Sequence, residues 1–366
     1  MTTGQRGRVA APDIGQRTRG WRVALIALAG VSLLTGLNAG LLRLGVWAPV
    51  ASERLSDLHG PVMVLGFMGT LISLERAQAM RHPVAYLGPA LFGVGSLSLI
   101  VGAPPALGKL LVLDGALAFL GLTVALWRRA PLGLVAAQSL AALFTVLFAG
   151  LWLVTELAPL LPLLAAFLVI TIAAERAELA QLTMGRRAVP TLLALGGLMT
   201  AGAVLSLGLP DLGGRVVGLA CLIIALWLLR DDVGRRLIRT DRLRRYNAAA
   251  LLTGNIWLAV AGVVWLAVGQ PASAGAYDAV IHATFLGFGM AMIMAHAPII
   301  FPAVIGRPLP YGAAMWGPLL LLNVGMVLRL SGGLAGVPPL YRTGGMITVL
   351  AVLSFALTVI VAVVRS

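Results

Sequence analysis

Residues 278–303 read DAVIHATFLGFGMAMIMAHAPIIFPA, an apolar run long enough to cross a bilayer as one helix. A helix rises 1.5 Å per residue, so about twenty apolar residues span ~30 Å of hydrocarbon. Eleven other runs of similar character complete the pattern. The twelve are 22–44, 58–79, 84–102, 107–127, 132–154, 159–181, 189–209, 214–230, 247–268, 278–303, 313–331 and 343–364. The sequence therefore predicts an all-α polytopic membrane protein of about twelve transmembrane helices.

The composition supports a bilayer environment for nearly the whole chain. Hydrophobic residues make up 60% of the 366 residues and charged residues only 11%, whereas a soluble domain carries about 25% charged residues. The net charge of +14 comes almost entirely from arginines in short loops, which is a topology signal and gives no reason to expect a nucleic-acid partner. The single cysteine, Cys221, excludes a disulfide framework and a thiolate metal site.

The distribution of basic residues predicts the orientation. Of the 27 lysines and arginines, 21 fall on the side of the N-terminus and six on the other side. Because basic residues accumulate in cytoplasmic loops, both termini are expected to be cytoplasmic in a bacterial-type inner membrane, with lipid as the surrounding partner. Residues 1–21 are predicted to form a cytoplasmic tail and residues 22–366 a single twelve-helix domain.

A weak internal repeat relates three of the runs. The triplets Glu-Arg-Ala at 75–77 and 175–177 lie at the same end of the second and sixth runs. His59 begins the second run as His282 begins the tenth. The second, sixth and tenth runs thus correspond, which predicts a pseudo-threefold arrangement of three four-helix units.

His59 and His282 are expected at a similar depth near the outer face, since both runs cross in the same direction. Two neutral imidazoles can fill both axial positions of a haem iron. The alternative is a pair of interfacial histidines that bind only water or backbone. Position by itself leaves both interpretations open.

Three segments carry a resemblance to a known family. Residues 282–307, HATFLGFGMAMIMAHAPIIFPAVIGR, place a histidine, a Phe-Pro pair and a glycine at characteristic distances. Residues 59–63 read HGPVM, and residues 336–342, in a predicted outer loop, read GVPPLYR. In the catalytic subunit of haem-copper oxidases, residues 282–307 resemble helix 10, residues 59–63 resemble helix 2, and residues 336–342 resemble a propionate-binding loop. The chain is also similar in topology to NnrS-type relatives of that family.

The resemblance implies one low-spin haem b whose iron is bound by His59 and His282. It also implies that the haem propionates are held near the outer face by Arg342, Arg329, Arg43 and Tyr341, with Arg342 favoured because it follows the matched tyrosine. For each arginine the alternative is contact with lipid headgroups or water. An arginine fork suits a carboxylate geometrically.

The sequence also departs from that family at several ligand positions. Val280 stands where the oxidases carry the histidine of the oxygen-reducing haem, and the sixth and seventh runs contain no histidine for copper. Pro339 and Leu340 replace the arginine pair of the propionate loop. A standard terminal oxidase or nitric oxide reductase is therefore not expected, nor is copper.

A second candidate site lies toward the inner face. His296 follows His282 by fourteen residues, so it lies about 21 Å deeper, on the side where Glu75, Glu175 and Glu178 end their helices. A cluster of these four could carry protons or a metal. The alternative is that the glutamates pair with nearby arginines and that His296 donates to a backbone carbonyl.

The predicted function is that of a membrane b-type haem protein for electron transfer or for nitric oxide or oxygen chemistry, with a quinol or an outer-face donor as partner. Two alternatives remain at this point: a haem-free proton or cation transporter, and an assembly protein of a respiratory complex. The sequence identifies no catalytic residue and leaves open whether the protein is an enzyme.

Overall fold

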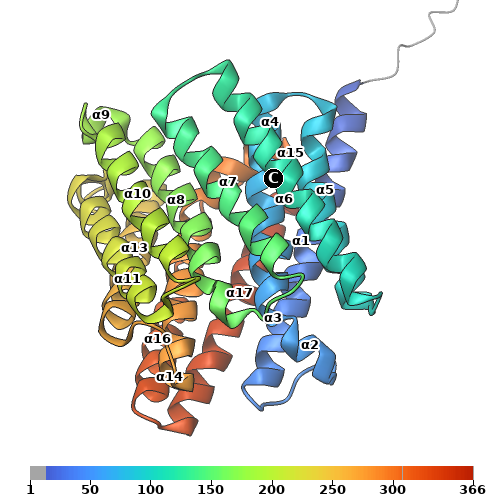
Figure 1. Cartoon of the computed structure of the whole chain (residues 1–366). Helices are drawn as coiled ribbons and strands as arrows, with labels where there is room; N and C mark the ends of the chain where they lie inside the picture. Colours follow the sequence, from blue (N-terminus) through green and yellow to red (C-terminus); the bar gives the residue numbers. More distant parts are fainter. Residues whose placement is uncertain (1–13, 307, 366) are drawn as a thin grey trace, which may run out of the picture.

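The computed structural model describes residues 14–306 and 308–365, and within them every regular element is helical (Figure 1). The long helices are α1 (Ile14–Arg43), α4 (Thr70–Met80), α5 (Leu87–Val101), α6 (Pro105–Arg129), α7 (Gly133–Leu151), α8 (Leu161–Leu179), α10 (Ala188–Leu205), α11 (Pro210–Asp231), α13 (Arg242–Val268), α15 (Ala291–Ile305), α16 (Trp316–Leu334) and α17 (Pro338–Arg365). The shorter elements are α2 (Glu53–Asp57), α3 (His59–Pro61), η1 (Val62–Gly69), η2 (Pro83–Tyr86), η3 (Ala158–Leu160), α9 (Gln181–Met184), α12 (Gly234–Leu237), α14 (Ala274–Ile281), η4 (His282–Met290) and η5 (Ala313–Met315).

The prediction of an all-α polytopic membrane protein is confirmed. Among the described residues, eleven helices are long and apolar enough to cross a membrane. The remaining expected span, 58–79, corresponds to α3, η1 and α4, which follow one another without a break from His59 to Met80. Helix α1 begins at Ile14, inside the stretch expected to be a tail. The rest of that predicted tail, residues 1–13, lies outside the described residues.

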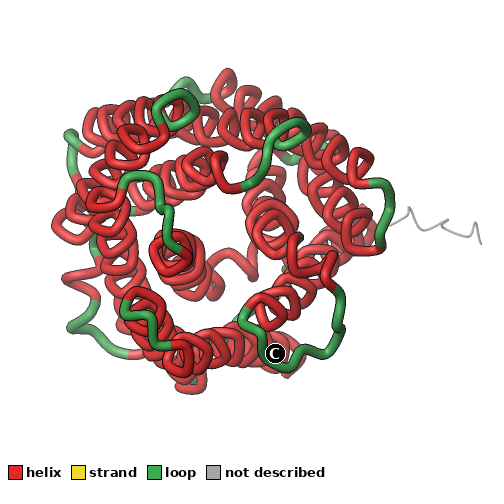
Figure 2. The backbone as a smooth tube through the Cα atoms, turned by 60° about the horizontal axis from the view of Figure 1, so that its bottom comes forward, coloured by secondary structure: helices red, strands yellow, loops and turns green. Residues whose placement is uncertain are grey.

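Two of the segments expected to correspond form the interior of the bundle. In the span formed by α8 and the turn before it, 83% of the most apolar 18 residues are buried inside the protein. In the span Ala274–Pro302 the corresponding figure is 72%, and in the other nine candidate spans it is 28% to 56%. Figure 2 shows the helices encircling this interior. Because lipid is as apolar as leucine, this burial reflects helix packing and not escape from water.

Both histidine-bearing segments contain a π-helical stretch. η1 begins three residues after His59 and η4 begins at His282 itself. π-helical turns are rare and are frequently found at functional sites. The shared local structure supports the correspondence between the second and tenth runs, whereas α8 is α-helical throughout.

Three of the six basic residues on the predicted outer side serve the helix ends. Arg54 donates to the last carbonyls of α5 at 2.5 and 2.9 Å, and Arg215 donates to those of α13 at 2.9 Å. Lys109 donates to the carbonyl of Trp152, just after α7, at 2.7 Å. The last four carbonyls of a helix have no partner within it. These charges therefore have a structural use that does not depend on a ligand.

Glycines allow α11 and α13 to pack closely. A Cβ atom added at Gly262 would lie 2.6 Å from the Leu222 nitrogen and 2.8 Å from the Gly218 oxygen, both of which are backbone atoms. Backbone at a helix crossing moves only if the helices separate. The contact is the close approach that small residues permit in membrane bundles.

We expect Gly262→Ala to lower the stability of the purified protein by about 1–3 kcal/mol, because the methyl group overpacks this crossing. Thermal unfolding in detergent micelles measures it. Gly196→Ala is the matched control, since nothing lies within 4 Å of its Cβ position. Alanine there should be neutral or slightly stabilising. Equal effects of the two changes would contradict the packing argument.

Candidate functional site

His59 stands at the start of α3, at the end of the bundle where α2 and α14 also lie (Figure 1). Its Nδ1 lies 2.8 Å from the backbone oxygen of Gly36 in α1. A carbonyl oxygen only accepts hydrogen bonds, so Nδ1 must carry the proton and donate it. In the neutral ring, Nε2 is then left with a free lone pair.

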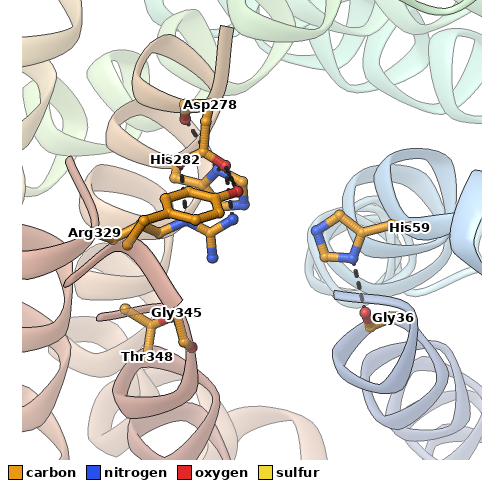
Figure 3. Close-up of polar contacts among 8 residues, drawn as sticks. Gly36, His59, Asp278, His282, Arg329, Gly345 and Thr348 are labelled. Atoms are coloured by element: carbon orange, nitrogen blue, oxygen red, sulfur yellow. Dashed lines mark hydrogen bonds and ion pairs between the residues drawn. The ribbon is translucent and has the colours of Figure 1, made fainter. Parts of the chain in front are cut away.

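His282 has the same arrangement on the opposite wall. Its Nδ1 donates to the backbone oxygen of Asp278 at 3.0 Å and lies 3.1 Å from Oδ1 of the same residue. Figure 3 shows the His59 and His282 rings reaching toward each other across one space. Their centroids are 6.1 Å apart and their planes are inclined by 26°.

This separation matches two imidazoles on opposite sides of one metal ion. An imidazole nitrogen binds a metal at about 2.0 Å, so the centroids of two trans ligands are roughly 6 Å apart. Metal-bound histidines also usually donate their other ring nitrogen to a carbonyl or carboxylate, which fixes the tautomer. Both features are present in the pair.

The carboxylate of Asp278 joins three helices behind His282. Arg329 of α16 donates to its two oxygens at 2.9 and 2.7 Å, and the Tyr341 hydroxyl of α17 donates to Oδ1 at 3.0 Å. The Arg329 side chain is 8% exposed and stands 5.3 Å from the Tyr341 ring centroid. The bidentate pair neutralises both charges and holds His282 in position.

A cavity of about 500 Å³ opens beside the histidine pair. Its walls include Val64, Leu161, Leu164 and Phe285, and a smaller cavity of about 70 Å³ bordered by the same two histidines extends it inward. Six glycines line the larger space: Gly40, Gly60, Gly275, Gly332, Gly333 and Gly336. The volume falls in the range of cofactor pockets. The Cβ positions of Gly275 and Gly332 would meet the backbone of Gly333 and Tyr341, so these glycines let α14, α16 and α17 pack closely around the space. The donor set and the cavity therefore fit a haem.

The expected propionate partners are placed differently from one another. Arg43 and Arg329 both line the cavity, but Arg329 gives Nε and Nη2 to Asp278, and only its Nη1 has no partner within the described residues. Tyr341 lines the cavity with its hydroxyl bonded to Asp278. Arg342 is exposed beside Gly45 and is not among the residues that line the cavity. Of the two arginines that line the cavity, Arg43 is thus the one whose side chain makes no hydrogen bond or ion pair to a described residue.

A family model described as "Domain of unknown function (DUF8744)" matches residues 22–364. The chain belongs to this family. No curated protein matches the sequence. The match covers nearly the entire helical bundle, so the histidine pair and its supporting network lie inside the part that defines this DUF8744 protein.

Asp278 is the site residue that the sequence analysis missed. A signal was present, because Asp278 precedes His282 by four residues and both therefore share one helix face. An aspartate in an apolar run is also a functional candidate by default. The acceptor of His59, a backbone carbonyl of another helix, has no signature in a sequence.

The inner candidate residues gather in part. His296, Glu75 and Glu175 line one cavity of about 100 Å³ between the three corresponding segments, and Glu178 is outside that lining. This places the second, sixth and tenth runs around a common space, as the repeat predicted. Within the described residues no group of three or more His, Cys, Asp or Glu side chains is arranged to hold a metal ion.

Arginines engage the inner groups. Arg76 donates to Glu175 at 2.9 Å. Arg176 binds both oxygens of Asp232 at 2.8 and 2.7 Å and approaches His296 Nε2 at 3.0 Å. His296 Nδ1 donates to the Met292 carbonyl at 2.7 Å. Both nitrogens of His296 are thus engaged, which is the paired arrangement considered as the alternative to a metal or proton site.

We expect Asp278→Asn to destabilise the protein by about 3 kcal/mol, because it leaves the buried Arg329 charge without its partner. Thermal unfolding in detergent, scanned beside the wild type, measures the loss. Asp211→Asn removes the partner of Arg215 in a pair whose side chains are 66% and 42% exposed. That control should cost no more than about 1 kcal/mol. Similar losses in both variants would show that the Asp278 network is not a buried unit.

Proposed function

We propose that this DUF8744 protein is a membrane b-type haem protein in which His59 and His282 hold one haem b and which transfers electrons in a bacterial-type inner membrane. The observation that carries the proposal is the pair itself. Each Nδ1 is occupied by a backbone carbonyl, and the rings face each other at 6.1 Å. Two unrelated interfacial histidines would not be expected to have the same tautomer and to face each other at this distance.

A bound haem would supply one-electron chemistry. His59 and His282 would bind the iron. Arg43 and the free Nη1 of Arg329 would offer cationic donors to the propionates. The apolar walls of the cavity would exclude water, which lowers the reorganisation that a change of charge requires.

Electron transfer is favoured over gas binding by the way the histidines are held. His59 and His282 would both be engaged by the iron, so nitric oxide or oxygen would bind only if one of them moved away. Each ring is fixed by a hydrogen bond, and His282 also by the Asp278 carboxylate, which opposes displacement. A quinol or an outer-face donor is the proposed redox partner.

The resemblance to haem-copper oxidases and NnrS-type relatives is consistent with this proposal but limits it to one haem. Val280, two residues before His282 in the sequence, offers no imidazole to a second iron. The excess of arginines at the other end supports cytoplasmic termini and a histidine pair near the outer face.

The haem-free alternatives receive less support. A proton or cation pathway would need ionisable groups free to bind their cargo, whereas Glu175 and His296 are already bound by arginines. A role in assembling a respiratory complex would give the histidine pair no reason to be aligned. We therefore carry only the haem proposal forward.

Purified protein, expressed with added haem precursor, should contain about one haem b per chain and give a low-spin reduced-minus-oxidised visible spectrum. His59→Ala and His282→Ala should each abolish that spectrum, since each removes an axial ligand. His82→Ala is the control, because His82 is exposed and caps a short turn. Its spectrum should be unchanged.

Colourless wild-type protein would contradict the proposal. So would a haem spectrum that survives both alanine substitutions at full intensity, because the ligands would then lie elsewhere. The haem content is to be measured by pyridine haemochrome, which reports haem type and stoichiometry independently of coordination.

A further inference from the structure

A second large cavity lies at the opposite end of the bundle from the histidine pair. It has a volume of about 550 Å³ and is lined by arginines at the end of α11 and in and after α12, together with Thr183 of α9. In Figure 1, α9 is at the top and α14 is at the bottom. The arginines are Arg230, Arg235, Arg236 and Arg239.

The cavity has a surplus of positive charge. Arg230 binds both oxygens of Asp231 at 2.7 and 2.9 Å, so that pair is neutral. The other acidic wall residue, Asp232, is bound by Arg176. No ion pair or hydrogen bond engages the side chains of the remaining arginines within the described residues. These three, Arg235, Arg236 and Arg239, are exposed and leave about three unbalanced charges around one hollow.

This arginine cavity is built on a fixed base. The Asp232 side chain is 3% exposed, accepts from the Val233 nitrogen at 2.6 Å, and is clamped by Arg176 in α8. Gly234 at the start of α12 is buried, and its Cβ position is 3.5 Å from the Leu252 side chain of α13. The base of α12 is therefore attached to the core, and its arginines project from a short helix held in place.

We propose that the arginine cavity binds a ligand carrying a net anionic phosphate group. The planar arginine fork donates two parallel hydrogen bonds to phosphate oxygens, and several such forks around one hollow suit that geometry. The helices on either side, α11 and α13, are both candidate membrane spans. The cavity thus lies at the level of lipid headgroups, where basic pockets between helices bind anionic lipids. A phospholipid headgroup or a soluble phosphate compound can supply the same chemistry.

The alternative explanation is that these arginines only set the orientation of the chain in the membrane and bind no ligand. A charge-matched comparison separates the two. The site variant is Arg235→Gln/Arg236→Gln/Arg239→Gln. The control variant, Arg81→Gln/Arg128→Gln/Arg129→Gln, removes the same charge from exposed arginines that do not line the cavity.

The full-length proteins are titrated in neutral detergent with dioleoyl phosphatidylglycerol, dioleoyl phosphatidylcholine and inorganic phosphate, and binding is followed by native mass spectrometry and calorimetry. We expect wild-type protein to bind the anionic lipid about tenfold more tightly than the zwitterionic one. The site variant should lose at least about tenfold in that affinity, because losing even one charged hydrogen bond costs about one decade. The control variant should match the wild type within twofold.

The arms distinguish the sources of phosphate. If inorganic phosphate binds with the same dependence on the three arginines and competes with the lipid, the cavity takes a soluble phosphate ligand. If only phosphatidylglycerol shows that dependence, the ligand is a lipid headgroup. Equal loss in the site and control variants, or equal affinity for the two lipids without phosphate binding, would overturn the proposal.

A third variant, in which lysines replace the same three arginines, separates loss of binding from misfolding. Arg235→Lys/Arg236→Lys/Arg239→Lys keeps the charge but removes the fork. It should bind more weakly than the wild type and more tightly than the glutamine variant. Lysine and glutamine variants of identical affinity would contradict a phosphate-binding role, provided that both run as the wild type in size-exclusion chromatography.

Discussion

The carboxylate of Asp278 is the interaction on which the outer end of the bundle depends. It accepts from Arg329 of α16 and from Tyr341 of α17, and its Oδ1 lies 3.1 Å from Nδ1 of His282, so one side chain of α14 joins α16 and α17 beside the histidine. A buried charge in a membrane protein is costly unless it is paired and hydrogen-bonded. The pair is bidentate, and the remaining donor is a hydroxyl. The arrangement fixes the position of His282 more firmly than packing alone would do.

His59 is held by a weaker but equivalent device, a hydrogen bond to the Gly36 carbonyl of α1. The two histidines thus begin their segments with the same tautomer and face each other from helices 223 residues apart in the sequence. Each segment continues into a π-helical stretch. A π-helix changes the angular spacing of side chains, which alters the faces that the following residues present to the interior. The segments that carry the two histidines therefore also form part of the packed interior of the bundle.

Sequence reasoning predicted most of the fold because hydrocarbon thickness sets the length of every span. Apolar runs were sufficient to place the helices and to expect His59 and His282 at a similar depth, and the two rings do lie close together. The first predicted span, 22–44, agrees with the apolar part of α1, Gly20–Arg43. The helix itself begins earlier, at Ile14, in a polar segment where hydropathy carries no signal. The role of Asp278 was missed for a different reason. Its partners, Arg329 and Tyr341, come from two later helices, and only the tertiary structure brings them together.

The candidate ligands for haem propionates show the same limit. Arg342 was favoured because it follows a matched tyrosine, but a neighbour in sequence on a helix does not face the same space. Arg342 is exposed and does not line the cavity, whereas the other two predicted arginines, Arg43 and Arg329, do. The inner histidine, His296, was correctly placed beside Glu75 and Glu175, yet Arg176 and the Met292 carbonyl occupy its nitrogens.

The central proposal is that His59 and His282, each fixed by its Nδ1, would together hold one haem iron. Electron paramagnetic resonance of the oxidised, haem-loaded protein tests this most directly, because spin state reports the axial ligands. The account predicts a single low-spin ferric signal, typical of haem iron held by two histidines, in the purified protein without added quinol or nitric oxide. A high-spin, five-coordinate signal from intact wild-type protein would contradict it.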